Sequence, residues 1–498
     1  MRVAYQAGVV RALLEEPLRF FHADGTSGGI INLAMLLSGL TVDQMCDRWR
    51  TVNIKDFASL MPLDRYLSSP GLEAMGDADG IVNRVFPHLG IDVSRIRAAR
   101  GMEGTFNVCN FSRKTNEVIP HDKVDLDLLV AGMSLPIFMP PVRKGEDLYT
   151  DSVWIKDANL MEAVRRGAEE LWVVWCIGNT GEYRTGVFNQ YVHMIELSAN
   201  GALFEEFDRI QEINARIQRG EAAFGQTRPI RLHLIRPEYP LPLDPELYLG
   251  EIDTASLIAM GYSDGKHYLE NRTDEGLPFE PETTKMKDGT LGIAFRETMA
   301  GGFSLQESDP EEGQRKGKAA GNILSLHAAV EIVDIKRFRE EPTHAGRLTG
   351  HIDFRPFGGQ IPGKNGVFNL FSPGDQPNLK LMVYELPFER DGQDYYLAGR
   401  KEVRNDPGFD LWKDTTTLYT RLHQGSDKTG PVVGAGVLTL GPEDLIKLVT
   451  TIRVTNAKSL KEKSEAIGDF TRFFLGELAD SYLNHAAPGG GPTPTPRT

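Results

Sequence analysis

The residues best suited to chemistry form a glycine-flanked serine near the start of the sequence. Residues 25–29 read Gly-Thr-Ser-Gly-Gly, which matches the pattern G-x-S-x-G, and they separate an apolar run ending at Ala23 from an apolar helical stretch. In this pattern the serine lies on a tight strand-to-helix bend that exposes its hydroxyl as a nucleophile. We therefore predict that Ser27 attacks a carbonyl carbon and forms an acyl-enzyme.

The glycines around Ser27 suit such a bend. Glycine has no side chain, so Gly25, Gly28 and Gly29 allow the strained backbone and the close approach that the bend requires. The predicted helix begins directly after the serine, and the first amides of a helix have no intrahelical acceptor. We expect the Gly28 amide to stabilise the oxyanion that forms during acyl transfer.

A second match to the same pattern occurs at residues 261–265, which read Gly-Tyr-Ser-Asp-Gly. The chain contains 51 glycines, so chance matches are expected. Residues 254–260 have a helical pattern, and no predicted strand leads to Ser263. We interpret this motif as a helix-terminating turn and favour Ser27 as the nucleophile. A glycine-rich turn without catalysis is the alternative for residues 25–29.

A serine nucleophile needs a base, and the residues alone leave that base open. The chain has 11 histidines, of which His22, His121 and His193 fall in the amino-terminal region. Each of these is more commonly a structural or surface residue than a catalytic one. His22 could act as the base only if its side chain turned toward Ser27.

Several further motifs occur in a characteristic order. Residues 1–13 (M-R-V-A-Y-Q-A-G-V-V-R-A-L) precede the serine motif, and S-L-P at 134–136, P-P at 140–141 and Y-T-D at 149–151 follow it. Asn159 and Gly-Ala at 167–168 then lead into an apolar run at 171–175. Over about the first 270 residues the chain resembles the patatin-like phospholipases. The resemblance implies a three-layer α/β/α domain.

The resemblance also supplies a base. The family uses a Ser-Asp dyad without histidine, which implies that Asp151 activates Ser27. It implies a lipid or other acyl-ester substrate and no metal or organic cofactor. A carboxylate near pKa 4 is a weak base at neutral pH, so Asp151 needs burial to raise its basicity. Ser152 and Val153 follow Asp151 where the family has small residues, and a turn residue ending a strand is its alternative role.

The family's opening strand and glycine-rich loop precede the residues that match here. The sequence begins at the fourth position of that loop, with Arg2 present and Val3 where the last glycine is usual. We expect either that Met1 is an incorrectly assigned start or that the domain is truncated at its amino terminus. Losing oxyanion donors costs about 10²-fold or more in rate, so a true truncation predicts weak or absent hydrolysis.

A chain of 498 residues exceeds what one hydrophobic core usually supports, so we expect at least two domains. Residues 1–270 alternate short apolar runs, as at 18–23, 105–111 and 171–177, with helical segments, which is typical of an α/β domain. Residues 271–289 are rich in Pro, Glu, Thr and Lys, which predicts a linker. Residues 486–498 have the composition of a disordered tail.

Residues 290–485 carry β-strand patterns and predict a sandwich or barrel. The expected strands share apolar or alternating runs between turn residues, at 325–332, 347–354, 379–386, 395–403, 415–422 and 432–440. Helices at 442–451 and 460–482 are expected to close this domain. Motifs at 299–303, 366–371 and 406–418 give it a weak resemblance to the β-rich accessory domain of cholesterol-oxidase-like proteins. No G-x-G-x-x-G follows a strand here, so we expect no flavin site.

The charge balance excludes some partners. With 69 acidic and 55 basic residues, the net charge of −14 repels nucleic acid and anionic membranes. Three cysteines are too few for a disulfide framework, which favours the cytoplasm. No apolar run is long enough to span a bilayer, so any membrane contact is expected to be peripheral. The sequence carries no signal for an oligomeric state.

Taken together, these features predict a serine lipid acyl-hydrolase of the phospholipase, lipase or esterase type. The competing hypothesis is a non-catalytic lipid-binding or scaffold protein that retains the fold. A thioesterase or protein deacylase on the same fold is a third possibility.

Overall fold

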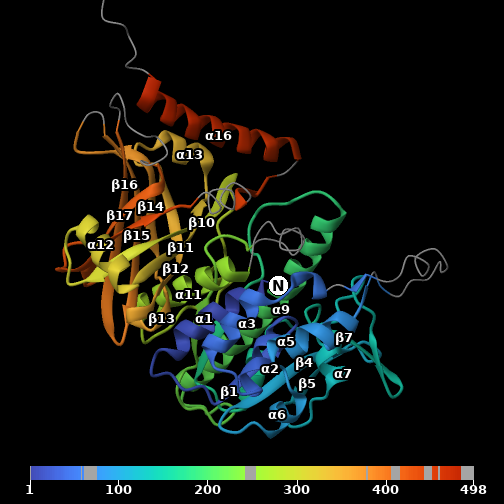
Figure 1. The fold of residues 1–498 in the computed structure, drawn as a ribbon. Helices are drawn as coiled ribbons and strands as arrows, with labels where there is room; N and C mark the ends of the chain where they lie inside the picture. The colour runs from blue at the N-terminus through green and yellow to red at the C-terminus, as the bar shows by residue number, and fades with distance from the viewer. Residues whose placement is uncertain are drawn as a thin grey trace, which may run out of the picture. The chain divides into compact units, whose positions relative to one another are not determined.

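The structure is a computed structural model, and its chain forms two compact units, residues 1–288 and 289–498 (Figure 1). It describes residues 2–57, 59–60, 74, 76–241, 254–376, 379–404, 415–441, 451–457 and 460–483. The predicted fold class is confirmed, because a mixed α/β region precedes a closed antiparallel β-barrel. The expected helix at 442–451, apart from its last residue, and the expected tail at 486–498 lie outside the described residues.

The first unit alternates helices and strands along the chain. Its helical segments are α1 (Val3–Leu14), α2 (Gly29–Leu37), α3 (Val42–Thr51), η1 (Ile54–Phe57), η2 (Ile81–Val85), α5 (Phe86–Leu89), α6 (Val93–Ala98), α7 (Leu126–Ala131), α8 (Leu160–Arg165), α9 (Val187–Gln218), α11 (Thr254–Asn271) and η3 (Pro281–Thr284). Its strands are β1 (His22–Thr26), β2 (Ser59–Leu60), β3 (Gly76–Asp77), β4 (Glu103–Asn110), β5 (Thr115–Pro120), β6 (Val142–Lys144), β7 (Asp147–Asp151), β8 (Glu170–Val174) and β9 (Arg231–Ile235).

Strand β4 organises the larger sheet of this unit. It is buried from Gly104 to Asn110, as expected for a strand with neighbours on both edges. One edge pairs with β5, and the other edge is shared by β1, which is parallel, and β7, which is antiparallel. β8 and β9 form a separate parallel pair. Among the described residues, β1 pairs with β4 alone and β8 with β9 alone, so each keeps one edge without a strand.

Helices α1 and α11 pack so closely that glycine is needed where they cross. A Cβ on Gly8 would lie 2.0 Å from the Ile258 carbonyl oxygen, and one on Gly261 would lie 2.0 Å from the Tyr5 carbonyl oxygen. This corrects our prediction that residues 261–265 terminate a helix. The motif lies inside α11, with Ser263 buried, because packing against α1 outweighs the low helix propensity of glycine.

Residues 271–288, most of the expected linker, lie within the first unit. Phe279 and Met286 are buried there beside α9, and the Met286 amide donates a hydrogen bond to the Asn179 carbonyl oxygen. Leu277 packs against the same cluster, so three apolar side chains attach this otherwise polar stretch to the unit.

The second unit is built around a barrel. Its strands are β10 (Gly292–Leu305), β11 (Ile323–Ile332), β12 (Ala345–Phe354), β13 (Gly359–Pro362), β14 (Gly366–Pro373), β15 (Leu379–Arg390), β16 (Gln393–Arg404), β17 (Thr417–Gln424), β18 (Val432–Thr439) and β19 (Arg453–Thr455). The pairings run β10-β11-β12-β14-β15-β16-β17-β18 and return to β10, so the sheet closes without an edge. Of the two predicted alternatives, the domain is therefore a barrel.

Apolar side chains fill most of the barrel interior, and a cluster of three polar residues is buried among them. Phe295, Met299 and Phe303 of β10 point inward at alternate positions, as do Met382, Leu386 and Phe388 of β15. Glu297, Tyr384 and Lys401 are buried among them. Lys401 Nζ lies 3.5 Å from Glu297 Oε2 and 3.3 Å from the Tyr384 hydroxyl, so this ammonium and carboxylate neutralise each other inside the barrel.

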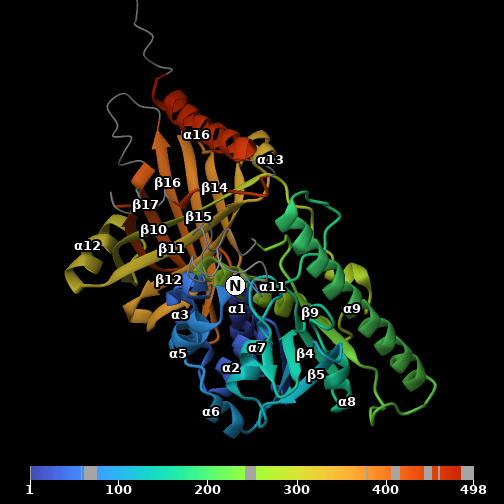
Figure 2. The same ribbon diagram turned by 90° about the vertical axis from the view of Figure 1, so that its right-hand side faces the viewer.

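Helices complete the second unit: α12 (Pro310–Ala320), α13 (Ile335–Glu340), η4 (Arg355–Phe357) and α16 (Leu460–Leu483). Asp309 caps α12 by accepting a hydrogen bond from the Glu312 amide, and Gly321 ends this helix with a left-handed backbone. Figures 1 and 2 show α13 and α16 at the same end of the barrel, where Phe470 of α16 is buried near Phe338 of α13.

Candidate active site

The serine predicted to be the nucleophile lies on a sharp bend between β1 and α2. Ser27 has φ 51°, a left-handed conformation that costs free energy for a residue with a side chain. The adjacent glycines make the bend possible. A Cβ on Gly25 would lie 3.0 Å from the Gly29 carbonyl oxygen, and one on Gly28 would lie 2.4 Å from Val3 Cγ1. The local sequence therefore folds as the G-x-S-x-G pattern predicts.

The register of β4 brings Asp151 to this bend. Thr26, the last residue of β1, pairs with Asn107, and Asp151, the last residue of β7, pairs with the next residue, Val108. β5 occupies the other edge of β4 along residues 105–110, so β1 and β7 meet end to end on the same edge. The two chain segments, 124 residues apart, thus place the side chain after Thr26 beside Asp151.

The predicted pair makes a short hydrogen bond. Ser27 Oγ donates to Asp151 Oδ2 at 2.7 Å, and the Val153 amide donates to Asp151 Oδ1 at 2.9 Å. Asp151 is 0% exposed. Burial raises its pKa from 3.8 to about 7, although both hydrogen bonds act in the opposite direction. The carboxylate is therefore a far stronger base than an exposed aspartate.

A chain of amide side chains supports the loop after Asp151. Asn107 Oδ1 accepts hydrogen bonds from Asn116 and Asn159, and Asn116 Oδ1 accepts one from the Ser152 hydroxyl at 2.6 Å. Ser152 stands where the family resemblance suggests a smaller residue. Its hydroxyl is thus bonded to Asn116 of β5, the strand that pairs with β4. Asn107 Nδ2 also donates to Asp24, so the network joins β1, β4, β5 and the Asp151 loop.

The three histidines that were considered as bases form hydrogen bonds with groups other than Ser27. His22 Nε2 lies 2.8 Å from Thr105 Oγ1, and burial lowers the pKa of His22 to about 4. His121 Nδ1 accepts a hydrogen bond from the Gly104 amide. His193 lies on α9 and contacts Arg184 and Glu196. In contrast, the Ser27 hydroxyl donates to Asp151.

Ser27 opens into a cavity of about 1050 Å³. The cavity is lined by α1, α2, the facing parts of β1 and β8, and the first turns of α9, and most of these side chains are apolar. Those from the start of α9 are Phe188, Tyr191, Val192 and Ile195. Its size and apolar walls would accept a long hydrocarbon chain next to the serine.

The carboxyl groups of Asp24, Asp157 and Glu196 also line this cavity, and none of the three was predicted from the sequence. Burial raises the pKa of Asp24 to about 7, and burial together with the charge of Asp151 raises the pKa of Asp157 to about 8. Both therefore carry a proton for much of the time at neutral pH. Asp157 lies in the same short block as Asp151 and Asn159, and this clustering of polar residues was the available signal.

The part of the chain that the structure describes contains no group of three or more His, Cys, Asp or Glu placed to hold a metal ion. Residues 1–164, which include Ser27, Asp151 and Asp157, match the family of patatin-like phospholipases. They form a patatin-like phospholipase domain. The match agrees with the resemblance predicted from the motifs, over a shorter range than the expected 270 residues. No curated protein matches the chain.

In the part of the chain that the structure describes, no helix is both long enough and apolar enough to cross a membrane.

Proposed function

We propose that the protein is a serine acyl-hydrolase that cleaves lipid esters through a Ser27–Asp151 dyad. The observation that supports this most strongly is the 2.7 Å hydrogen bond from Ser27 Oγ to a fully buried carboxylate, made on a strained bend that opens into an apolar cavity. A serine and a base in this arrangement are the parts that nucleophilic acyl transfer requires.

Acylation follows from the geometry of this pair. Ser27 Oγ attacks the ester carbonyl carbon while its proton passes to Asp151 Oδ2. The negative charge develops on the carbonyl oxygen, near the beginning of α2, where the Gly28 and Gly29 amides have no intrahelical acceptor. When the tetrahedral intermediate collapses, the ester C–O bond breaks and the leaving alkoxide takes the proton from Asp151.

Deacylation uses the same residues in reverse order. Water loses a proton to Asp151 as it attacks the acyl carbon, and collapse of the second intermediate returns that proton to Ser27 Oγ. The fatty acid leaves, and the resting hydrogen bond forms again. Neither half-reaction needs a redox step or a group other than Ser27, Asp151, water and the oxyanion donors.

Long-chain esters fit the cavity better than small polar ones. Its walls are mostly apolar, and burial raises the pKa values of Asp24 and Asp157, which favours their neutral forms. Each CH₂ group transferred from water into such a site contributes about 0.8 kcal/mol. We expect kcat/KM to rise with acyl length until the cavity is full.

Hydrolysis of a series of soluble p-nitrophenyl esters tests the proposal. We expect turnover by the intact chain, a loss of at least 10³-fold in Ser27→Ala, and unchanged rates in Ser263→Ala, whose serine is buried in the rival motif within α11. If Ser27→Ala retains the wild-type rate, the proposal is wrong. If the intact chain binds esters without cleaving them, the non-catalytic lipid-binding alternative takes its place.

A further inference from the structure

Helix α9 runs along the first unit (Figure 2). Its first turns carry apolar residues on two adjacent faces. Phe188, Tyr191, Val192 and Ile195 form the face that lines the cavity. Val187, Met194 and Leu197 form a second stripe, and they are 91%, 51% and 75% exposed. A helix at the surface of a soluble protein normally keeps polar residues on its outer face, so this stripe needs an explanation.

The second half of the same helix provides the comparison. The same face continues beyond Leu197 at steps of three or four residues, first to the exposed Gly201. It then carries exposed charged residues only: Glu205, Asp208, Glu212, Arg216 and Arg219. One helical face is thus charged along its second half and uncharged along its first. The charged residues between 183 and 201, Arg184 and Glu196, are partly buried, so the first half suits an apolar and uncharged environment.

The exposed stripe continues into the wall of the cavity. Phe188 and Phe138 are each 37% exposed, and both also line the cavity. Phe138 packs against Tyr191 of α9 with ring centroids 5.2 Å apart. Its neighbour Ile137 is 54% exposed and has φ 77°, a strained conformation for a β-branched residue. Side chains from two segments therefore extend from the cavity to the surface.

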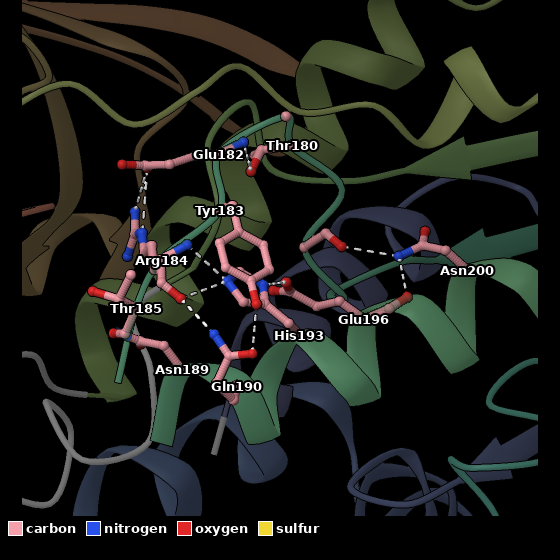
Figure 3. A network of polar contacts seen from close by, with 12 residues as sticks. Thr180, Glu182, Tyr183, Arg184, Thr185, Asn189, Gln190, His193, Glu196 and Asn200 are labelled. Carbon is pink, nitrogen blue, oxygen red and sulfur yellow. Dashed lines mark hydrogen bonds and ion pairs between the residues drawn. The ribbon is translucent and has the colours of Figure 1, made fainter. Parts of the chain in front are cut away.

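Polar groups near the start of α9 bond one another (Figure 3). The Tyr183 hydroxyl donates to Gln190 Oε1 at 2.7 Å, the Arg184 amide donates to His193 Nε2 at 2.9 Å, and the Tyr183 and His193 rings stack. Arg184 also pairs with Glu182. These bonds hold the chain before α9 against the helix. Because these polar groups bond to one another, they leave an apolar surface beside them.

We propose that Ile137, Phe138, Val187, Phe188, Met194 and Leu197 form a docking surface for a zwitterionic or neutral lipid surface. The inference rests on the proposed function, because the docked lipid would enter the cavity beside Phe138 and Phe188. A zwitterionic surface fits better than an anionic one, since the six residues of the docking surface carry no charge and the whole chain carries a net charge of −14.

Binding to vesicles tests the docking surface separately from catalysis. Full-length Ser27→Ala protein is sedimented with sucrose-loaded phosphatidylcholine vesicles, which it cannot hydrolyse under the proposed mechanism. We expect binding that does not change between 50 mM and 500 mM salt. Adding Val187→Glu and Leu197→Glu should lower the vesicle partition coefficient at least tenfold, because both charges would have to enter the lipid interface. Neither residue lines the cavity, so the change leaves the cavity wall intact.

A matched control carries the same added charge on the solvated half of the helix. Ala215→Glu and Gln218→Glu are at exposed positions, and this variant should bind vesicles as the parent does. The proposal is overturned if the parent fails to bind, if it binds only anionic vesicles in low salt, or if V187E/L197E binds equally well. Self-association through this face without vesicle binding also overturns it. Lost vesicle binding in V187E/L197E supports docking even if the intact chain hydrolyses no ester.

Discussion

Replacing Asp151 by asparagine should strongly reduce activity and stabilise the protein at the same time. Asparagine has the same shape, so its Oδ1 can accept the hydrogen bond from the Val153 amide while its Nδ2 donates to Ser27 Oγ. The variant therefore keeps the local contacts but loses the base. General-base catalysis contributes about 10²- to 10⁴-fold, and we expect kcat/KM to fall by that factor.

The gain in stability follows from the raised pKa of Asp151. Its rise from 3.8 to about 7 means that the folded protein resists ionisation of this group. At about 1.4 kcal/mol per pKa unit, the ionised carboxylate lowers the free energy of unfolding by up to about 4 kcal/mol. This cost is absent below pH 3.8, grows as pH rises toward 7, and is constant above. Asparagine stays neutral, so D151N should be more stable by up to about 4 kcal/mol at pH 8 and by less than half of that at pH 5.

Urea unfolding at pH 5 and pH 8, combined with ester hydrolysis, measures both effects. The Ser27→Ala variant is the control for activity, since it removes catalysis and leaves the buried charge in place. A D151N variant that is no more stable than wild type at pH 8 would refute the claimed burial cost. A D151N variant with wild-type activity would refute the assignment of Asp151 as the base.

Three further changes follow from the described contacts. We expect the wild-type kcat/KM to rise as pH increases through about 7 and to fall above about 8, where Asp157 ionises in the cavity that holds Ser27 and its charge opposes the developing oxyanion. Asp157→Asn should remove the fall and keep the rise, which a pH–rate profile checks. Lys401→Met leaves Glu297 buried without its cation and should lower the free energy of unfolding by about 3–5 kcal/mol, whereas adding Glu297→Met should restore most of it; urea titration compares them. Gly28→Ala introduces a Cβ 2.4 Å from a methyl group of α1 and should lower thermal stability, while Gly29→Ala meets nothing closer than 3.9 Å and should not; equal melting temperatures would contradict this.

The local parts of the candidate site could be predicted because their signals are short. The glycines around Ser27 and the apolar runs beside them specify a strand, a bend and a helix within a few residues. That Asp151 meets Ser27 depends on two consecutive pairings of β4, at Asn107 and Val108, and no periodicity of the sequence reveals such a register. The family resemblance supplied what the residues alone could not. Asp157 was missed because a cavity, and not a motif, gives it significance.

The fold shows the same division between local and long-range information. The expected strands at 325–332 and 432–440 correspond to β11 and β18, since alternating patterns are local. Sequence patterning could not decide between sandwich and barrel, because closure depends on the pairing of β18 with β10 across the domain. The glycine motif around Ser263 misled us for a related reason. Its backbone is kept helical by contact with α1, some 250 residues earlier in the chain.

Peptide mapping after reaction with a fluorophosphonate measures directly whether Ser27 is an activated nucleophile. The reagent phosphonylates an activated serine hydroxyl irrespective of the natural substrate. We predict a single adduct on the peptide that contains Ser27. This adduct should be lost in Ser27→Ala, form far more slowly in Asp151→Asn, and remain in Ser263→Ala. An intact chain that stays unlabelled, or one labelled at another serine, would contradict this prediction.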